Sequence, residues 1–252
     1  MSGTRSPSRT APATERRAAL LVAHGAPSAP AGPERAIRAL AERVAALLPG
    51  VTVAGATLAA PGALEAALAA LPGTAPLIFP VFMADGWFVR EKLPQRIGRT
   101  CGGSFEMLGP LGLDPALHRL CLDYALEGAR AAGLPPARTT LLLAAHGSPS
   151  DPAPREAVAA ALRIIAGAAV FRQVRPGFID EAPFLAEAAQ IEGPALCLPF
   201  FAGRAGHVAS DIPQALAAAG FDGLLLDSIG RHDRVAAIVA TALAARAGRR
   251  AA

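Results

Sequence analysis

Two histidines stand in motifs that could bind a metal ion. His146 lies in HGSPSDP directly after an apolar segment, and His207 lies in PFFAGRAGHVASDIP after another. A third polar group, Asp180 with its neighbour Glu181, ends the stretch RPGFIDE before a proline. Neutral imidazole and carboxylate together bind divalent iron, cobalt, nickel or zinc, and an incomplete ligand shell leaves positions for a substrate.

Each of these residues also has a purely structural explanation. A histidine in a turn can be satisfied by backbone groups, and an acidic residue before a helix often caps it. Asp211, two residues before Pro213, fits a helix cap better than a metal ligand. One of Asp180 and Glu181 can likewise cap a helix over residues 183–190. What favours a metal site is the combination of two histidines and a carboxylate, each at the end of a strand in the same half.

The chain is internally duplicated. The stretch LLVAHGAPS at residues 20–28 recurs as LLAAHGSPS at residues 142–150, an offset of 122. PLIFPVFM at residues 76–83 recurs as ALCLPFFA at residues 195–202, an offset of 119. We therefore expect two tandem domains, residues 18–134 and residues 135–252, after a disordered N-terminal extension over residues 1–17.

Short apolar segments alternate with amphipathic ones in each half, which predicts strands alternating with helices. The first half predicts these strands and helices in turn: 19–23, 33–48, 51–58, 61–71, 77–83, 93–99, 104–108 and 115–132. The second half repeats this order, with strands at 140–145 and 195–201. Such alternation predicts parallel sheets with right-handed crossovers, and ligands bind beyond the carboxyl ends of the strands. The fold class expected is α/β: two parallel sheets, each flanked by helices, facing each other across a cleft.

The repeat gives an internal comparison of the two halves. His24 is the counterpart of His146, whereas the offset of 119 makes Phe88 the counterpart of His207. Counted back from Pro61 and Pro183, the counterpart of Asp180 is Leu58. One half thus keeps one of three polar groups and the other keeps all three, which is the pattern of a duplicated protein with one working site.

Composition excludes several classes of protein. Hydrophobic residues make up 52% of the 252 residues, yet every apolar run is interrupted before about 18 residues, so we expect a soluble protein that does not enter a membrane. The net charge of +4 comes from scattered arginines without interleaved aromatic residues, so nucleic acid is not an expected partner. The three cysteines form no CxxC pair, and the N-terminus lacks the apolar segment of a secretory signal, so we expect the cytoplasm. Neither GxGxxG nor GxxxxGK[ST] stands at a strand–helix junction, which argues against nucleotide binding.

These motifs identify a resemblance to the class II chelatases. HGSPS, FID before a proline and GRAGHVASDIP resemble the sirohydrochlorin cobaltochelatase/ferrochelatase branch, over about residues 17–248. The resemblance implies two flavodoxin-like domains that face each other over a tetrapyrrole cleft. It implies that His146 and His207 bind the metal and accept protons, and that Asp180 replaces the usual glutamate, with Glu181 as the alternative. Co²⁺ or Fe²⁺ would be a substrate, and no organic cofactor would be needed.

The resemblance also suggests how the substrate is held and leaves one alternative function. Three arginines would bind its carboxylates, two aromatic residues would stack on it and a histidine would line the cleft: Arg155, Arg204, Arg90, Trp87, Phe88 and His24. Each arginine can equally be a solvated surface charge, and each aromatic residue can belong to the core. The expected role is metal insertion in cobalamin or siroheme biosynthesis by a monomer or homodimer. The alternative, favoured by the short Asp180 side chain, is a non-catalytic carrier of metal or tetrapyrrole with the same fold.

Overall fold

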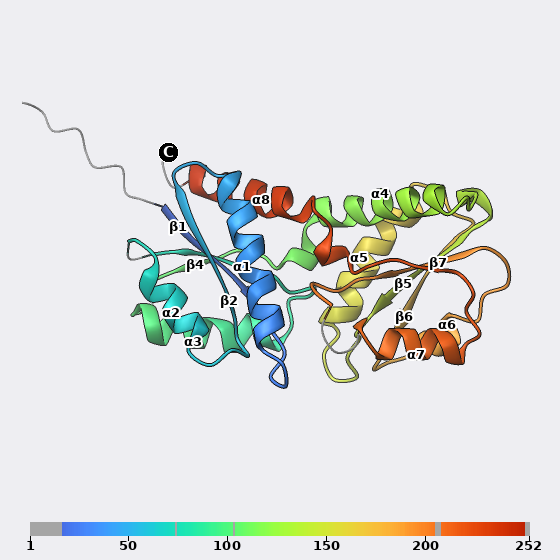
Figure 1. Ribbon diagram of the computed structural model, residues 1–252, viewed down its shortest axis with the longest axis horizontal. Coiled ribbons are helices and arrows are strands. Elements are labelled where there is room, and N and C mark those ends of the chain that lie inside the picture. The colour runs from blue at the N-terminus through green and yellow to red at the C-terminus, as the bar shows by residue number, and fades with distance from the viewer. Residues whose placement is uncertain (1–16, 74, 103, 205–207, 250–252) are drawn as a thin grey trace, which may run out of the picture.

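Two four-stranded parallel sheets form the frame of the molecule (Figure 1). The computed structural model describes residues 17–73, 75–102, 104–204 and 208–249. The first sheet has the order β2-β1-β3-β4 and the second the order β6-β5-β7-β8, which is the flavodoxin-like order 2-1-3-4 twice. The strands are β1 (Arg17–Ala23), β2 (Val51–Thr57), β3 (Leu77–Pro80), β4 (Glu106–Met107), β5 (Thr140–Ala145), β6 (Gln173–Phe178), β7 (Ala195–Pro199) and β8 (Leu224–Leu225). The predicted α/β fold class is confirmed.

Eight α-helices of the described residues cover the sheets. They are α1 (Ala31–Ala46), α2 (Ala63–Ala70), α3 (Leu93–Cys101), α4 (Pro115–Ala131), α5 (Ala153–Gly167), α6 (Leu185–Ala188), α7 (Asp211–Ala218) and α8 (Val235–Arg249). A π-helical turn, η1 (Phe88–Lys92), leads into α3, and the described residues also contain the short 3₁₀ segments η2 (Leu111–Leu113), η3 (Pro136–Arg138) and η5 (Ile229–Arg231). Among the described residues, no helix is both long enough and apolar enough to cross a bilayer.

The central strands are apolar along their whole length because both faces of each sheet are covered. Alternate side chains of β1 point to opposite faces. Ala19 and Leu21 join a core that extends through both halves, whereas Leu20 and Val22 pack under α2 and α3. The second sheet repeats this arrangement, with α6 and α7 on its outer face. Continuous apolar strands of this kind are typical of parallel sheets with two buried faces.

The last helix of each repeat packs on the sheet of the other repeat. Helix α4 follows the first sheet in the chain but packs against α5 and β7, and α8 packs against α1 and β3 (Figure 1). In α4, a Cβ added at Gly128 would lie 2.7 Å from the side chain of Leu226, beside the second sheet. In α8, Arg246 forms an ion pair with Glu106 of β4. The sequence boundary at residues 134 and 135 therefore separates two repeats without separating two independently packed bodies.

Three predicted element boundaries are corrected. Arg17 was expected in the N-terminal extension but begins β1, where it pairs with Val51, and residues 1–16 lie outside the described part. The strand expected at 77–83 ends at Pro80, because the chain then leaves the sheet and residues 82–84 and 86–89 line a cavity. The helix expected over 183–190 is reduced to the four residues of α6.

Candidate functional site

The candidate residues lie where the strand order of each sheet reverses. In the first sheet β1 and β3 are neighbours, and their crossover connections leave in opposite directions. Such a switch point leaves a crevice beyond the carboxyl ends of the two strands. His24 follows β1 and Phe88 lies after β3, while His146 follows β5 in the second sheet. The fold thus brings both histidines of the repeat to the carboxyl edge of their sheets.

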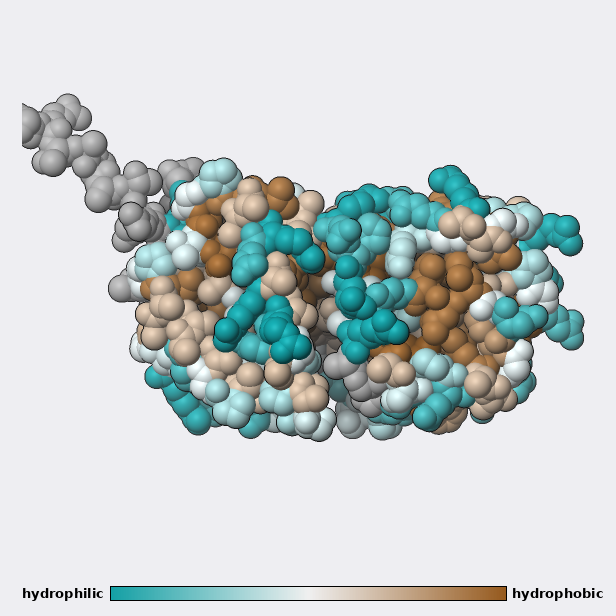
Figure 2. Space-filling model, in the orientation of Figure 1, coloured by the Kyte–Doolittle hydropathy of each residue, from teal (hydrophilic) through white to brown (hydrophobic). Residues whose placement is uncertain are grey.

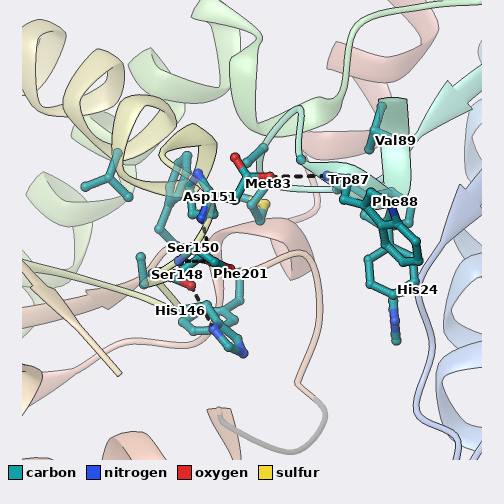
Figure 3. Close-up of a pocket in the computed structure, with 18 of the residues that line it drawn as sticks. His24, Met83, Trp87, Phe88, Val89, His146, Ser148, Ser150, Asp151 and Phe201 are labelled. Atoms are coloured by element: carbon teal, nitrogen blue, oxygen red, sulfur yellow. Dashed lines mark hydrogen bonds between the residues drawn. The ribbon is translucent and has the colours of Figure 1, made fainter. Parts of the chain in front are cut away.

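A cavity of about 660 Å³ lies between these two edges (Figure 3). His24 and His146 stand on opposite sides of it, with Trp87 and Phe88 on the side of His24. Its size is within the range of small-molecule sites. Among the described lining residues, Asp151 is the one acidic side chain and neither arginine nor lysine occurs. On the face shown in Figure 2, a groove separates the two halves, with hydrophilic side chains on both sides.

His146 is held by two oxygen atoms at one ring nitrogen. Its Nδ1 lies 3.0 Å from the carbonyl oxygen of Gly147 and 3.2 Å from Oδ2 of Asp180. Because both neighbours accept hydrogen bonds, Nδ1 carries the proton in the neutral ring and Nε2 presents its lone pair. The side chains of His146 and Asp180 are 44% and 45% exposed, so an ion from solvent can reach the pair.

Glu181, the alternative carboxylate, has a different set of partners. Its side chain is only 11% exposed; it accepts a hydrogen bond of 3.1 Å from the Ser148 N–H and forms an ion pair with Arg155. The Arg155 Nε also donates to it at 3.0 Å, and the guanidinium lies over the ring of Phe178. Glu181 therefore holds the loop that carries His146 in place. A substrate carboxylate that binds Arg155 would have to share the guanidinium with Glu181.

Gly147 explains why the HGS motif needs its glycine. Its φ angle is +77°, and a Cβ at this position would lie 2.6 Å from Cγ of Glu181. Gly25 in the first half has a φ of +80°, and a Cβ there would lie 2.8 Å from Thr57. A side chain would be strained by the backbone and obstructed by its neighbour in both halves.

In the first half, His24 has the same backbone contact as His146, but its side-chain neighbours are aromatic rings. His24 Nδ1 lies 2.9 Å from the Gly25 carbonyl oxygen, as His146 does with Gly147. The ring of Phe88 meets His24 edge-on with 4.5 Å between ring centroids, and Trp87 in turn lies 5.1 Å from Phe88. Trp87 and Phe88 are 45% and 38% exposed, which argues against the core explanation for both.

The backbone corrects one of the predicted counterparts. The Asp180 N–H donates to the His146 carbonyl oxygen at 2.9 Å, and in the first half the N–H that donates to His24 at 2.9 Å belongs to Ala59. The counterpart of Asp180 is therefore Ala59 and not Leu58. Counting back from the prolines failed because the segment before Pro183 is one residue longer than the segment before Pro61.

The remaining predicted residues either do not belong to the cavity lining or lie outside the described part. His207 belongs to residues 205–207, which the described ranges leave out. Within the described ranges, no group of three or more histidine, cysteine, aspartate or glutamate side chains could hold a metal ion. Arg204 is exposed, directly before this segment. Asp211 begins α7, and Ser210 Oγ donates to it at 2.7 Å.

Asp151 is a site residue that the sequence reasoning missed. Its Oδ2 accepts a hydrogen bond from the Trp87 N–H at 3.3 Å (Figure 3) and another from Arg90 Nη2 at 3.1 Å, both in the other half. Arg90 was expected as a possible substrate clamp, and its Nη1 also donates to the Asp85 carbonyl oxygen at 2.6 Å. The repeat offered a signal, because position 29, the counterpart of Asp151, is alanine.

Comparisons with known proteins agree with this arrangement. The family model for CbiX matches residues 140–246. The solved structure of CbiX, described as the terminal enzyme for biosynthesis of siroheme in denitrifying bacteria, has 47% sequence identity and a TM-score of 0.82, covering 91% of this chain and 99% of that chain. No curated protein matches the sequence.

Two more distant structures share the fold. SirB from Bacillus subtilis with Fe³⁺ has a TM-score of 0.74 at 17% identity, covering 91% of this chain and 94% of that chain. The sirohydrochlorin chelatase SirB from Bacillus subtilis subspecies spizizenii in complex with cobalt has a TM-score of 0.67 at 18% identity, with the same coverage of both chains. The identity to CbiX over nearly its whole length, together with the paired sheets and the HGS loops, shows that the chain belongs to the CbiX family.

Proposed function

We propose that the chain is a chelatase that inserts Co²⁺ or Fe²⁺ into a sirohydrochlorin-type tetrapyrrole, in siroheme or cobalamin biosynthesis. The observation that carries the proposal is the His146–Asp180 pair, which stands beside a cavity of about 660 Å³ with an aromatic wall opposite. Its relative CbiX, at 47% identity, is the terminal enzyme of siroheme biosynthesis in denitrifying bacteria. The metal ion is a substrate in this reaction.

His146 and Asp180 are spaced to bind one ion together. Two ligands that are each about 2.1 Å from one metal ion lie roughly 3 Å apart. The distance of 3.2 Å between His146 Nδ1 and Asp180 Oδ2 is that of a hydrogen bond in the metal-free protein. It also suits one ion bound by both atoms once the ring proton has moved from Nδ1 to Nε2. The aspartate, although one methylene shorter than glutamate, therefore reaches the imidazole. Glu181 is a weaker candidate because Arg155 and the Ser148 N–H already engage its carboxylate.

The repeat supports His207 as the third group of the site. The register of β5 with β7 and of β1 with β3 fixes the offset at 119, since Pro80 and Pro199 occupy equivalent positions. This offset makes residue 207 the counterpart of Phe88, and Phe88 lies against His24. We therefore assign His146, Asp180 and His207 as the metal-binding set, with the two histidines as proton acceptors.

A flat macrocycle suits the lining of the cavity. Trp87 and Phe88 present exposed aromatic rings, and His24 lies behind Phe88. Because no arginine or lysine occurs among the described lining residues, the peripheral acids of the substrate would lie at the rim. Arg204 is exposed, directly precedes residues 205–207 in the chain, and remains the predicted partner for a carboxylate.

The reaction requires an exchange of charge that these groups can support. Insertion of a divalent ion into a tetrapyrrole replaces two pyrrole N–H protons. A neutral imidazole can accept a proton from a pyrrole N–H and pass it to water. Release of the metal from His146 and the arrival of pyrrole protons are thus complementary events at the same side chains.

An anaerobic insertion assay tests the proposal. Sirohydrochlorin and Co²⁺ or Fe²⁺ are mixed with and without the protein, and the absorbance change is followed. We expect acceleration, and we expect His146→Ala and His207→Ala each to lose at least about 100-fold in rate. His232→Gln, which changes a histidine outside the cavity lining, serves as the matched control. A protein that binds metal and tetrapyrrole without acceleration would be a carrier, and the chelatase proposal would then be wrong.

A further inference from the structure

One carboxylate connects the two halves across the cavity. Asp151 follows the HGSPS stretch of the second half, and its partners Trp87 and Arg90 belong to the first half. The same oxygen, Oδ2, accepts from the Trp87 N–H at 3.3 Å and from Arg90 Nη2 at 3.1 Å. Gly86 also packs closely here, because a Cβ added to it would lie 3.3 Å from Asp151 Oδ2.

Asp151 is itself fixed to the loop that carries His146. Its N–H donates to Ser148 Oγ at 3.1 Å, and its Oδ1 accepts from the Ala153 N–H at 3.0 Å. The hydrogen bond from Ala153 and then the charge of Arg90 lower the pKa of Asp151, so the carboxylate is ionised at neutral pH. The Ser148 N–H donates in turn to Glu181. A connected set of contacts therefore runs from the His146 loop to Trp87.

The sequence of the other half does not provide the ion pair of this connection. The counterpart of Asp151 is Ala29, and the counterpart of Arg90 is Ala209. Neither alanine can form an ion pair. The ion pair is therefore not a contact that the two repeats share by symmetry. It involves the segment that also carries the exposed rings of Trp87 and Phe88.

We propose that Asp151 is a positioning residue. It holds segment 86–90 against the His146 loop, a contact that we call the clamp. The clamp sets the distance between His146 and the rings of Trp87 and Phe88, and this space, the slot, receives the planar tetrapyrrole. The identity of the ligand rests on the proposed function, whereas the clamp is a property of the free protein. With the clamp released, the aromatic wall moves away from the metal-binding side and stacks less closely on the macrocycle. Metal binding by His146 and Asp180 is unaffected.

Trp87 is the single tryptophan of the chain, so its fluorescence reports on the clamp directly. We compare wild type with Asp151→Asn, Asp151→Ala and Arg90→Gln. Asp227→Asn is the control, because it removes an aspartate–arginine pair of similar length, 2.6 Å to Arg231, whose residues do not line the cavity. Thermal unfolding of each variant identifies any that fails to fold.

Four measurements on the folded variants separate the positioning role of Asp151 from metal binding. Acrylamide quenching of the free protein should rise about twofold in Asp151→Ala and Arg90→Gln but not in Asp227→Asn. Quenching of Trp87 by metal-free sirohydrochlorin should give a Kd about tenfold higher in the clamp variants. The KM for tetrapyrrole should rise by the same factor, with kcat changed less than threefold. The affinity for Co²⁺, measured against a chromophoric chelator, should stay within twofold.

The outcomes distinguish this inference from the function on which it rests. Equal acrylamide quenching in wild type and Asp151→Ala would overturn the clamp. A changed quenching with an unchanged Kd for sirohydrochlorin would overturn its role in setting the slot. If the wild-type protein binds no sirohydrochlorin, the proposed function and the assigned ligand are both wrong, and the quenching of the free protein still decides whether Asp151 holds the segment.

Discussion

Nδ1 of His146 lies 3.2 Å from Oδ2 of Asp180, and this contact joins the loops that follow two neighbouring strands, β5 and β6. The Asp180 N–H also donates to the carbonyl oxygen of His146 at 2.9 Å. Backbone and side chain thus hold the same two residues together. The pair is therefore formed before any ion arrives, and binding requires little rearrangement of the loop.

The charge of Asp180 should govern metal affinity. Asp180→Asn keeps the size and removes the charge, so we expect Co²⁺ to bind about 10- to 100-fold more weakly. Asp180→Glu should retain binding within about tenfold, since it restores the longer carboxylate. Competition with a chromophoric chelator measures both. Asp222→Asn, an exposed residue outside the cavity lining, should match wild type. Unchanged affinity in Asp180→Asn would remove Asp180 from the site.

The backbone at Gly147 should be sensitive to a single methyl group. Gly147→Ala places a Cβ in the left-handed region and 2.6 Å from Glu181, whereas Gly133→Ala has a φ of +66° with open space around it. Gly133→Ala should cost about 1 kcal/mol from backbone strain alone. Gly147→Ala should cost at least about 1 kcal/mol more, which lowers Tm by a further 2–4 °C or so. Equal losses in the two variants would show that Glu181 yields without cost.

The corrected repeat alignment predicts how a second site could be built. Ala59→Asp with Phe88→His places a carboxylate and an imidazole at the counterparts of Asp180 and His207, beside His24. We expect this double variant to bind a second equivalent of Co²⁺, measured by titration calorimetry. Leu58→Asp with Phe88→His follows the uncorrected alignment and should bind one equivalent. Identical stoichiometry in the two double variants would contradict the backbone pairing.

Burial of His118 should make stability depend on pH. His118 is 3% exposed, and Nε2 lies 2.7 Å from the Gly112 carbonyl oxygen. Burial lowers the pKa of His118 below its ordinary value of 6.5, so the unfolded chain takes up a proton that the folded chain does not. The free energy of unfolding should therefore fall as pH drops below about 6.5, by up to about 1.4 kcal/mol per pH unit.

The matched variant for this pH effect is His118→Gln, which retains an N–H donor for the Gly112 carbonyl. Urea unfolding at pH 5.5 and pH 7.5 compares the two proteins. The loss of stability at the lower pH should be smaller in the variant. Parallel losses in both proteins would show that other groups cause the dependence.

Much of the architecture followed from the sequence because it is encoded locally. Apolar segments of strand length, prolines and glycines after helices, and an approximate repeat defined the sheets; the strand predicted at residues 140–145 is β5. His24 and His146 were placed at the edges of their sheets because each directly follows a strand. These features depend on neighbouring residues in the chain.

What the sequence did not reveal depends on contacts between distant residues. The bond from Asp151 to Trp87 spans 64 positions, and no local pattern marks it. The sequence could not show which of Asp180 and Glu181 contacts His146, because the two acids are neighbours in the chain. That choice needed their positions in three dimensions. The Ala59 pairing required the backbone hydrogen bonds, since a one-residue difference in loop length shifts any count along the chain.

The reciprocal packing of α4 and α8 has a consequence for how such a chain can arise. A half-length protein with this arrangement would leave part of one face of its sheet uncovered unless a second copy supplied its last helix, because the helix of its own repeat covers only the rest. It would therefore be stable only as a two-fold symmetric dimer, and the cavity between the sheets would lie on the dimer axis. Joining two copies through the short segment between α4 and β5 preserves every contact while freeing the two copies to differ. The two halves differ at the polar groups and at Asp151 and Arg90, and a fused chain allows such differences because each half has its own residues.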